Sequence, residues 1–133
     1  MSIESIELLE FAEKLLDTFD SEVAFRDCIS KSYYADFHTV QQSVSIQTPA
    51  YKNMGSHQRL ITSLEESHGV ESKDMKNKYR QLAYYLKSRK IVRARVDYQL
   101  GVDVTKEDAA NAIKESRRLQ DLCSNIRKKD EAA

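Results

Sequence analysis

The sequence predicts an all-α protein, an antiparallel up-and-down four-helix bundle with one additional short helix. Three observations lead to this expectation. The 133 residues include only three glycines and one proline, so few positions interrupt a helix. Apolar residues recur at three- and four-residue spacing along most of the chain. The connections between the long helices are short, which favours antiparallel neighbours. We expect one domain over residues 1–127, followed by a charged tail over residues 128–133 that frays.

The first two helices are expected over residues 2–19 and 21–46, with Ser2 and Ser21 as their N-caps. No glycine or proline interrupts the second one. The apolar stripe of the first helix consists of Leu8, Leu9, Ala12, Leu15, Leu16 and Phe19. An irregular loop is expected over residues 47–55, because it holds the chain's one proline and one of its glycines.

A short third helix is expected from Ser56, as its cap, to about residue 68, where Gly69 can adopt a left-handed conformation. The long fourth helix is expected over residues 72–99 and ends before Gly101. Leu60, Ile61 and Leu64 are the apolar residues of the third helix, and an apolar series from Met75 to Val96 marks the inner side of the fourth.

The last helix is expected over residues 105–127. Thr105 and Asp108 resemble a capping box, with aspartate in place of the usual glutamate. No internal repeat or low-complexity segment occurs in the chain.

Equal numbers of basic and acidic residues, 21 of each, conceal a segregation of charge. Residues 1–20 contain six acidic residues and one basic residue, whereas residues 76–95 contain eight basic residues and no acidic one. Two interpretations stay open: the oppositely charged faces attract each other within or between chains, or the basic helix faces a polyanion.

A soluble, cytoplasmic protein with no membrane partner is expected. Residues 1–16 carry four glutamates, unlike a signal peptide, and no apolar run approaches the roughly 18 residues of a membrane span. Cys28 and Cys123 are therefore expected to be reduced and buried as small apolar side chains.

Three arginines interrupt apolar helix faces. Arg89 and Arg93 lie on the same helical line as inward-facing leucines, and Arg26 shares a face with Tyr33. A guanidinium in such a position requires a carboxylate, carbonyl groups or a ligand. For Arg26 we favour an ion pair with Asp97, and for the other two we weigh a structural role against ligand binding.

The histidines give little indication of a metal or cofactor site, and neither is expected. No two of them have the i, i+4 spacing of paired metal ligands, and the cysteines form no Cys-x-x-Cys pair. His38 is interpreted as a core or interface residue, His57 as a cap or loop anchor, and His68 as a residue at a helix C-terminus.

The chain contains seven tyrosines and no tryptophan. In the adjacent pairs 33–34 and 84–85, one ring can face the core while the other faces a groove. The basic segment also carries Tyr98 beside Arg95, a combination that stacks bases and neutralises phosphates in RNA-binding proteins. Packing of the core is the alternative.

Three blocks of sequence resemble HEPN domains, the higher eukaryote and prokaryote nucleotide-binding helical proteins. They are FRDCISKSYYADFHTV, GSHQRLI and RARVDYQLGVDVTKEDAANAI, which occur in the family's order. The resemblance spans about residues 20–125, and the chain is most similar to the small stand-alone members of the family.

The resemblance implies a helical bundle that commonly forms a homodimer with a positively charged cleft at the interface. Members of the HEPN family act as metal-independent RNases in toxin-antitoxin and phage-defence systems or accompany minimal nucleotidyltransferases. The resemblance implies that RNA or a nucleotide binds at Arg26, Tyr33, Arg89, Arg93, Arg95, Asp97 and Tyr98.

The RNase members place a histidine four to six residues after an arginine, and this sequence departs from that pattern. Arg93 matches the arginine, but Tyr98 occupies the place of the histidine. Catalysis would require His38 or His57 to reach Arg93 from elsewhere in the fold. We therefore expect an RNA- or nucleotide-binding protein of a toxin-antitoxin or defence system. The alternatives are a metal-independent RNase and a non-catalytic interaction protein that binds a nucleotidyltransferase or an antitoxin.

Overall fold

The computed structural model describes residues 2–46 and 53–132, and all its regular elements there are helices. The all-α prediction is confirmed. The five helices are α1 (Ser5–Thr18), α2 (Glu22–Ser43), α3 (Ser56–Glu66), α4 (Lys73–Tyr98) and α5 (Lys106–Ala132).

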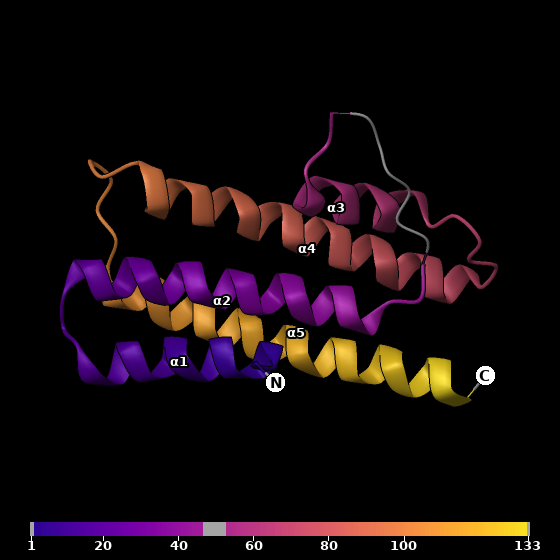
Figure 1. Ribbon diagram of the computed structural model, residues 1–133, viewed down its shortest axis with the longest axis horizontal. Coiled ribbons are helices and arrows are strands. Elements are labelled where there is room, and N and C mark those ends of the chain that lie inside the picture. The colour runs from indigo at the N-terminus through magenta and orange to yellow at the C-terminus, as the bar shows by residue number, and fades with distance from the viewer. Residues whose placement is uncertain (1, 47–52, 133) are drawn as a thin grey trace.

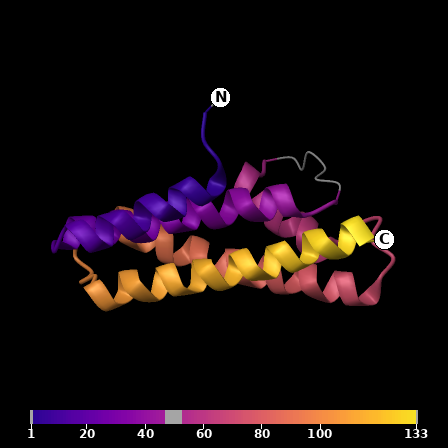
Figure 2. The ribbon, with the colours of Figure 1, turned by 90° about the horizontal axis from the view of Figure 1, so that it is seen from below.

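Helix α2 lies at the centre of the molecule and packs against α1, α4 and α5 (Figure 1). Helix α4 lies along one side of it, and α3 packs on α4. Helix α1 lies on the opposite side, next to α5, as the view turned by 90° also shows (Figure 2). Because α2 is covered on several sides, it buries more of its side chains than α1 does.

Two clusters of buried side chains form the core. The larger one joins α2, α3, α4 and α5, and it includes Phe37, Ile61, Leu64, Leu86 and Ile126. The smaller one lies near the start of α2 and the end of α4, and it includes Ala12, Phe25, Ile29, Val96 and Val104. Together they bury the apolar stripes that the helical spacing predicts.

Two predicted helix starts are confirmed. The hydroxyl of Ser21 accepts from the amide of Ala24 at 3.3 Å, and Thr105 and Asp108 form the reciprocal bonds of a capping box at the start of α5. Ser72 is the N-cap of α4, where its hydroxyl accepts from the amide of Met75 at 3.2 Å. At the end of α3 the left-handed C-cap is Ser67, with a φ of 51°, two residues before Gly69, whose φ is 80°.

Three local predictions are wrong. Helix α1 is capped by Glu4 and Glu7 in a capping box and not by Ser2, because the carboxylate of Glu7 accepts from the Glu4 amide at 2.6 Å. Phe19 follows the helix in extended backbone and is 54% exposed, so it does not belong to the apolar stripe. The N-cap of α3 is Gly55 and not Ser56.

The last helix also continues beyond the expected boundary at residue 127. It runs to Ala132, through most of the segment that we expected to fray. The ammonium of Lys129 lies 3.0 Å from a carboxylate oxygen of Asp74, and the hydroxyl of Ser45 donates to Asp130 at 3.1 Å. These contacts hold the end of α5 against neighbouring segments. The predicted loop lies mostly outside the described residues, because residues 47–52 are among those not described.

Both cysteines are free and buried, as predicted. Burial raises the pKa of each thiol to about 11, which keeps both protonated at neutral pH. Among the described helices, none is both long and apolar enough to cross a membrane.

Candidate functional site

Three helices bring an arginine, two tyrosines and a histidine together. Arg93 of α4, Tyr33 and Tyr34 of α2 and His57 of α3 form what we call the Arg93 cluster. The guanidinium carbon of Arg93 lies 5.5 Å from the ring centroid of Tyr33 and 5.7 Å from that of Tyr34, within cation–π range. The rings of Tyr33 and His57 are 5.5 Å apart and nearly parallel.

The local structure of α2 and α3 fixes the position of His57. Tyr33 and Phe37 are one helical turn apart on α2, so their rings share a face. The imidazole of His57 stacks on the ring of Phe37 with centroids 4.0 Å apart and 7° between the planes. Because His57 lies in the first turn of α3, the start of that helix places it over α2.

A hydrogen bond joins Tyr33 to His57, with 2.6 Å between the hydroxyl oxygen and Nδ1. Tyr33 is fully buried, and burial raises its pKa to about 12, so the hydroxyl keeps its proton. Within the described part of the chain, Nδ1 of His57 is the one acceptor recorded for that proton. The hydroxyl therefore donates to Nδ1, and a neutral His57 carries its own proton on Nε2.

Positive charge surrounds His57. Partial burial lowers its pKa, and the cations Arg93 and Lys90 lower it further, with a contribution from His38. A carboxylate oxygen of Asp97 lies 3.5 Å from Arg93, but that carboxylate also accepts from Ser30 at 3.3 Å. Nε of Arg93 has no hydrogen-bond partner in the part of the chain that the structure describes. The cluster therefore combines two cations near His57, Arg93 and Lys90, with one recorded carboxylate, Asp97, and it holds an N–H group without a recorded partner, a combination that suits an anion.

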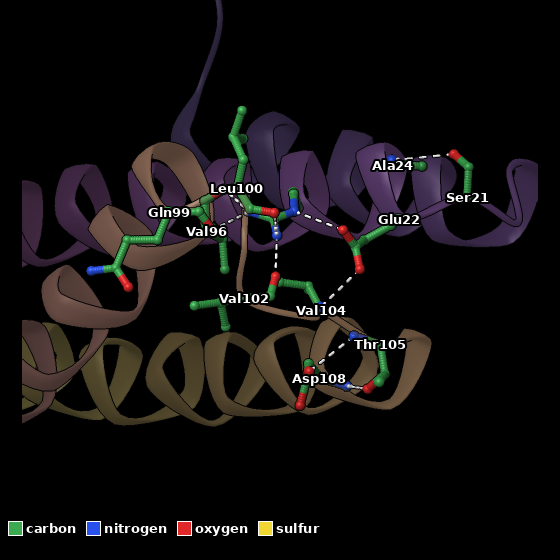
Figure 3. Close-up of polar contacts among 11 residues, drawn as sticks. Ser21, Glu22, Ala24, Val96, Gln99, Leu100, Val102, Val104, Thr105 and Asp108 are labelled. Atoms are coloured by element: carbon green, nitrogen blue, oxygen red, sulfur yellow. Dashed lines mark hydrogen bonds and ion pairs between the residues drawn. The ribbon is translucent and has the colours of Figure 1, made fainter.

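Arg26 has a different environment, at the point where α4 ends. Its guanidinium donates to the backbone carbonyls of Val96 at 2.8 Å and Gln99 at 3.2 Å, and to those of Leu100 and Val102 (Figure 3). Its Nε lies 3.2 Å from a carboxylate oxygen of Glu22, one turn earlier on α2. Arg26 therefore satisfies the last carbonyls of α4 and fastens the following turn to α2.

These contacts correct the predicted pairing of Arg26 with Asp97. Glu22 takes the place of Asp97, and its second oxygen accepts from the amide of Val104 at 3.0 Å (Figure 3). That backbone hydrogen bond lowers the pKa of Glu22. Since the donors of Arg26 are occupied and the side chain is buried, the geometry gives it a structural role.

Arg89 is held inside the fold with a carboxylate that the sequence did not single out. Its Nε lies 3.8 Å from a carboxylate oxygen of Asp36, which is fully buried on α2 and also accepts from Tyr85 at 3.4 Å. Burial raises the pKa of Asp36 to about 7. The sequence holds one signal that could have identified Asp36, since an aspartate among the buried positions of a helix requires a partner.

The remaining predicted site residues lie apart from the Arg93 cluster. Arg95 and Tyr98 are exposed, and Arg95 lines a cavity of about 260 Å³ together with Arg89. His38 is exposed too, and its ring meets that of Phe37 edge-on at 5.2 Å. The structure thus brings Arg93, Tyr33, His57 and Asp97 together and leaves Arg26, Arg89, Arg95, Tyr98 and His38 outside.

These residues belong to no recorded metal cluster and do not line the cavity between α4 and α5. No group of three or more histidine, cysteine or acidic side chains suited to a metal occurs in residues 2–46 and 53–132. The cavity between α4 and α5 has a volume of about 600 Å³, and Tyr85, Leu119 and Leu122 contribute to its lining. None of the predicted site residues lines it.

Comparison with known proteins finds no matching family model, no matching curated protein and no matching solved structure.

Proposed function

We propose that this protein binds the phosphate groups of RNA or of a nucleotide at the Arg93 cluster. The observation that carries the proposal is the proximity of Arg93 and His57. The groups that shift the pKa of His57 include Arg93, Lys90 and His38 but no carboxylate. Arg93 supplies a permanent cation, and His57 supplies an N–H donor on Nε2. Tyr34 adds a half-exposed aromatic ring on which a base can stack.

The setting follows the resemblance to HEPN domains. We infer that the four long helices form the family's antiparallel up-and-down bundle, and the packing of α2 against α1, α4 and α5 supports this. A role in a cytoplasmic toxin-antitoxin or defence system is the corresponding biological proposal.

The test is a salt titration of RNA binding by fluorescence anisotropy with the wild type, Arg93→Gln and Arg80→Ala. Arg80 is an exposed arginine of the same helix, outside the cluster, and serves as the matched control. For Arg93→Gln we expect affinity to fall about tenfold and the salt slope to decrease by about one, because one phosphate contact is lost. Absence of binding at low salt, or equal losses in the two variants, would overturn the proposal.

An active RNase is a second candidate, and the 2.6 Å contact between Tyr33 and His57 is the observation that favours it. With its pKa lowered, His57 is neutral near pH 7, and the hydrogen bond with Tyr33 holds its imidazole in a fixed orientation. Arg93 lies where it could stabilise charge on a phosphate in the transition state.

Incubation of the pure protein with total RNA in EDTA tests this candidate. Cleavage that disappears in both Arg93→Gln and His57→Gln supports an RNase, because the two residues would act together. Intact RNA with the wild type, in a preparation that binds RNA, identifies the protein as a binder alone.

A further inference from the structure

Helix α4 carries an apolar stripe on the side turned away from the Arg93 cluster. Tyr84, Ile91 and Tyr98 follow each other at seven-residue intervals, so they lie on one line along the helix. They are 77%, 66% and 76% exposed. Lys87 and Arg95, both exposed, flank Ile91 one turn to each side. We call these five residues the basic face.

Single exposed apolar side chains are normal, but a regular row of three on one helix indicates a contact surface. The basic face is separate from the proposed RNA site. Arg93 follows Ile91 by two residues, which is a rotation of about 200° around the helix axis. A partner on the basic face would therefore leave the Arg93 cluster open.

Helix α1 carries a face of the opposite charge. Glu10, Lys14 and Asp17 recur at four- and three-residue spacing, so the cation Lys14 lies between the two carboxylates, and Phe11 follows Glu10; all four are exposed. Phe11, at 48% exposure, lies among them as the apolar element. We call Glu10, Phe11 and Asp17 the acidic face. Glu10 and Asp17 take part in no ion pair recorded for the described residues.

The two faces do not meet within one molecule. Helices α1 and α4 lie on opposite sides of α2 (Figure 1). None of the ion pairs recorded over residues 2–46 and 53–132 joins α1 to α4, and Glu13 of α1 pairs with Arg117 of α5. The acidic residues of α1 and the basic residues of α4 therefore form no recorded ion pairs with each other within one molecule.

The faces match in chemistry. The stripe from Tyr84 to Tyr98 covers 15 residues, about 21 Å of helix, and the stretch from Glu10 to Asp17 covers eight residues, about 11 Å. Ile91 has two exposed cations one turn to either side, and Phe11 has two exposed carboxylates nearby, with the cation Lys14 between them. A single pair of helices buries less than a standard interface, so we expect weak, salt-sensitive binding.

We propose that copies of this protein associate head to tail, with the acidic face of one copy on the basic face of the next. A symmetric pair of α4 helices is disfavoured, because it would place two segments with eight basic residues each side by side. A heterologous contact leaves an unused face at each end, so the assembly can extend or close into a ring.

The experiment uses two charge-reversal variants of the full chain. The first, Glu10→Lys/Asp17→Lys, disables the acidic face, and the second, Lys87→Glu/Arg95→Glu, disables the basic face. The matched controls reverse exposed charges elsewhere, in Glu65→Lys/Asp121→Lys and Lys114→Glu/Lys128→Glu. Nucleic acid is removed first, and circular dichroism checks the fold of every variant. Sedimentation equilibrium then measures mass against protein and salt concentration.

We expect the mass of the wild type and of both controls to rise with protein concentration at low salt and to fall toward the monomer at high salt. Each face variant alone should stay a monomer. A mixture of the two variants has one intact face of each kind, and its two reversed faces are complementary to each other, so the mixture should associate again as the wild type does.

A wild type that stays monomeric at every concentration would overturn the proposal. So would a face variant that dimerises alone, which would indicate a symmetric interface such as that of the homodimer. A mixture of correctly folded variants that remains monomeric would overturn it too. The proposal is independent of RNA binding, because these measurements use protein freed of nucleic acid.

Discussion

The hydroxyl oxygen of Tyr33 lies 2.6 Å from Nδ1 of His57 and determines which nitrogen of that imidazole carries the proton. The two residues are 24 positions apart and belong to α2 and α3. A buried hydroxyl with a raised pKa donates to Nδ1 and stabilises the neutral ring. The imidazole therefore offers its remaining N–H to a ligand.

Tyr33→Phe tests this relationship. Removal of the donor should raise the pKa of His57, since its neutral form loses a hydrogen bond, and should lower the free energy of unfolding by about 1 kcal/mol. NMR titration of the imidazole nitrogens measures the pKa and the tautomer. Tyr34→Phe is the control, because no hydrogen bond of its hydroxyl is recorded in the described part of the chain. Identical His57 titrations in the two variants would contradict the assignment.

RNA binding should depend on pH through His57. Its pKa in the free protein lies below the ordinary 6.5, and a bound phosphate favours the protonated ring, so the ligand raises that pKa. Affinity should therefore increase as the pH falls below the raised His57 pKa of the complex, and it should level off below the His57 pKa of the free protein. Anisotropy titrations at constant ionic strength measure the effect, and in His57→Gln the added affinity should disappear. An equal pH dependence in that variant would exclude His57 as the group involved.

Arg26→Ala should destabilise the fold strongly. It leaves four backbone carbonyls at the end of α4 without their donor and Glu22 without its cation, and we expect a loss on the order of 3 kcal/mol or more. Urea denaturation measures the loss. Arg95→Ala removes an exposed arginine from the same region and should change stability by no more than about 0.5 kcal/mol. Similar midpoints for the two variants would show that Arg26 is not a structural clamp.

Asp36 should make the fold less stable as the pH rises. Its pKa of about 7 in the folded protein exceeds the 3.8 of an ordinary aspartate, so the folded state prefers the protonated carboxyl. This contribution is fully present below pH 4 and is lost as the pH rises toward 7. The groups around it are Arg89 and Tyr85 from α4, and Ser116 and Glu115 from α5.

The comparison of wild type with Asp36→Asn isolates this contribution. The difference in unfolding free energy between the two proteins should change by a few kcal/mol, about 1.4 for each tenfold change in proton concentration within that window. Urea denaturation from pH 4 to pH 8 measures it. Parallel stability curves for the two proteins would contradict the raised pKa of Asp36.

The sequence predicted those features that depend on near neighbours. Ser21 and the pair Thr105–Asp108 cap helices as expected, because a cap involves residues only three positions apart. Tyr33 is buried while Tyr34 is half-exposed, and Tyr85 is half-buried while Tyr84 is exposed. Adjacent positions on a helix point in different directions, so this split also follows from local geometry.

Contacts between distant segments were harder to predict. The partners of Arg26 on and after α4 are backbone carbonyl groups. Every residue has such a group, so no pattern of side chains could predict these contacts. The pairing of Arg89 with Asp36 depends on how α4 is rotated against α2. His57 was placed correctly at the start of a helix, but its contact with Tyr33 depends on how α3 is positioned relative to α2, which a sequence pattern does not give.

The turn after α4 has an unusual consequence for protein engineering. Surface connections usually accept inserted residues, which makes them suitable for fused tags or for new chain ends in a circular permutation. Between Gln99 and Val104, however, several backbone groups converge on Arg26 and Glu22, and one added residue would move them out of register. This short connection should therefore tolerate substitutions of its exposed side chains far better than any change in its length.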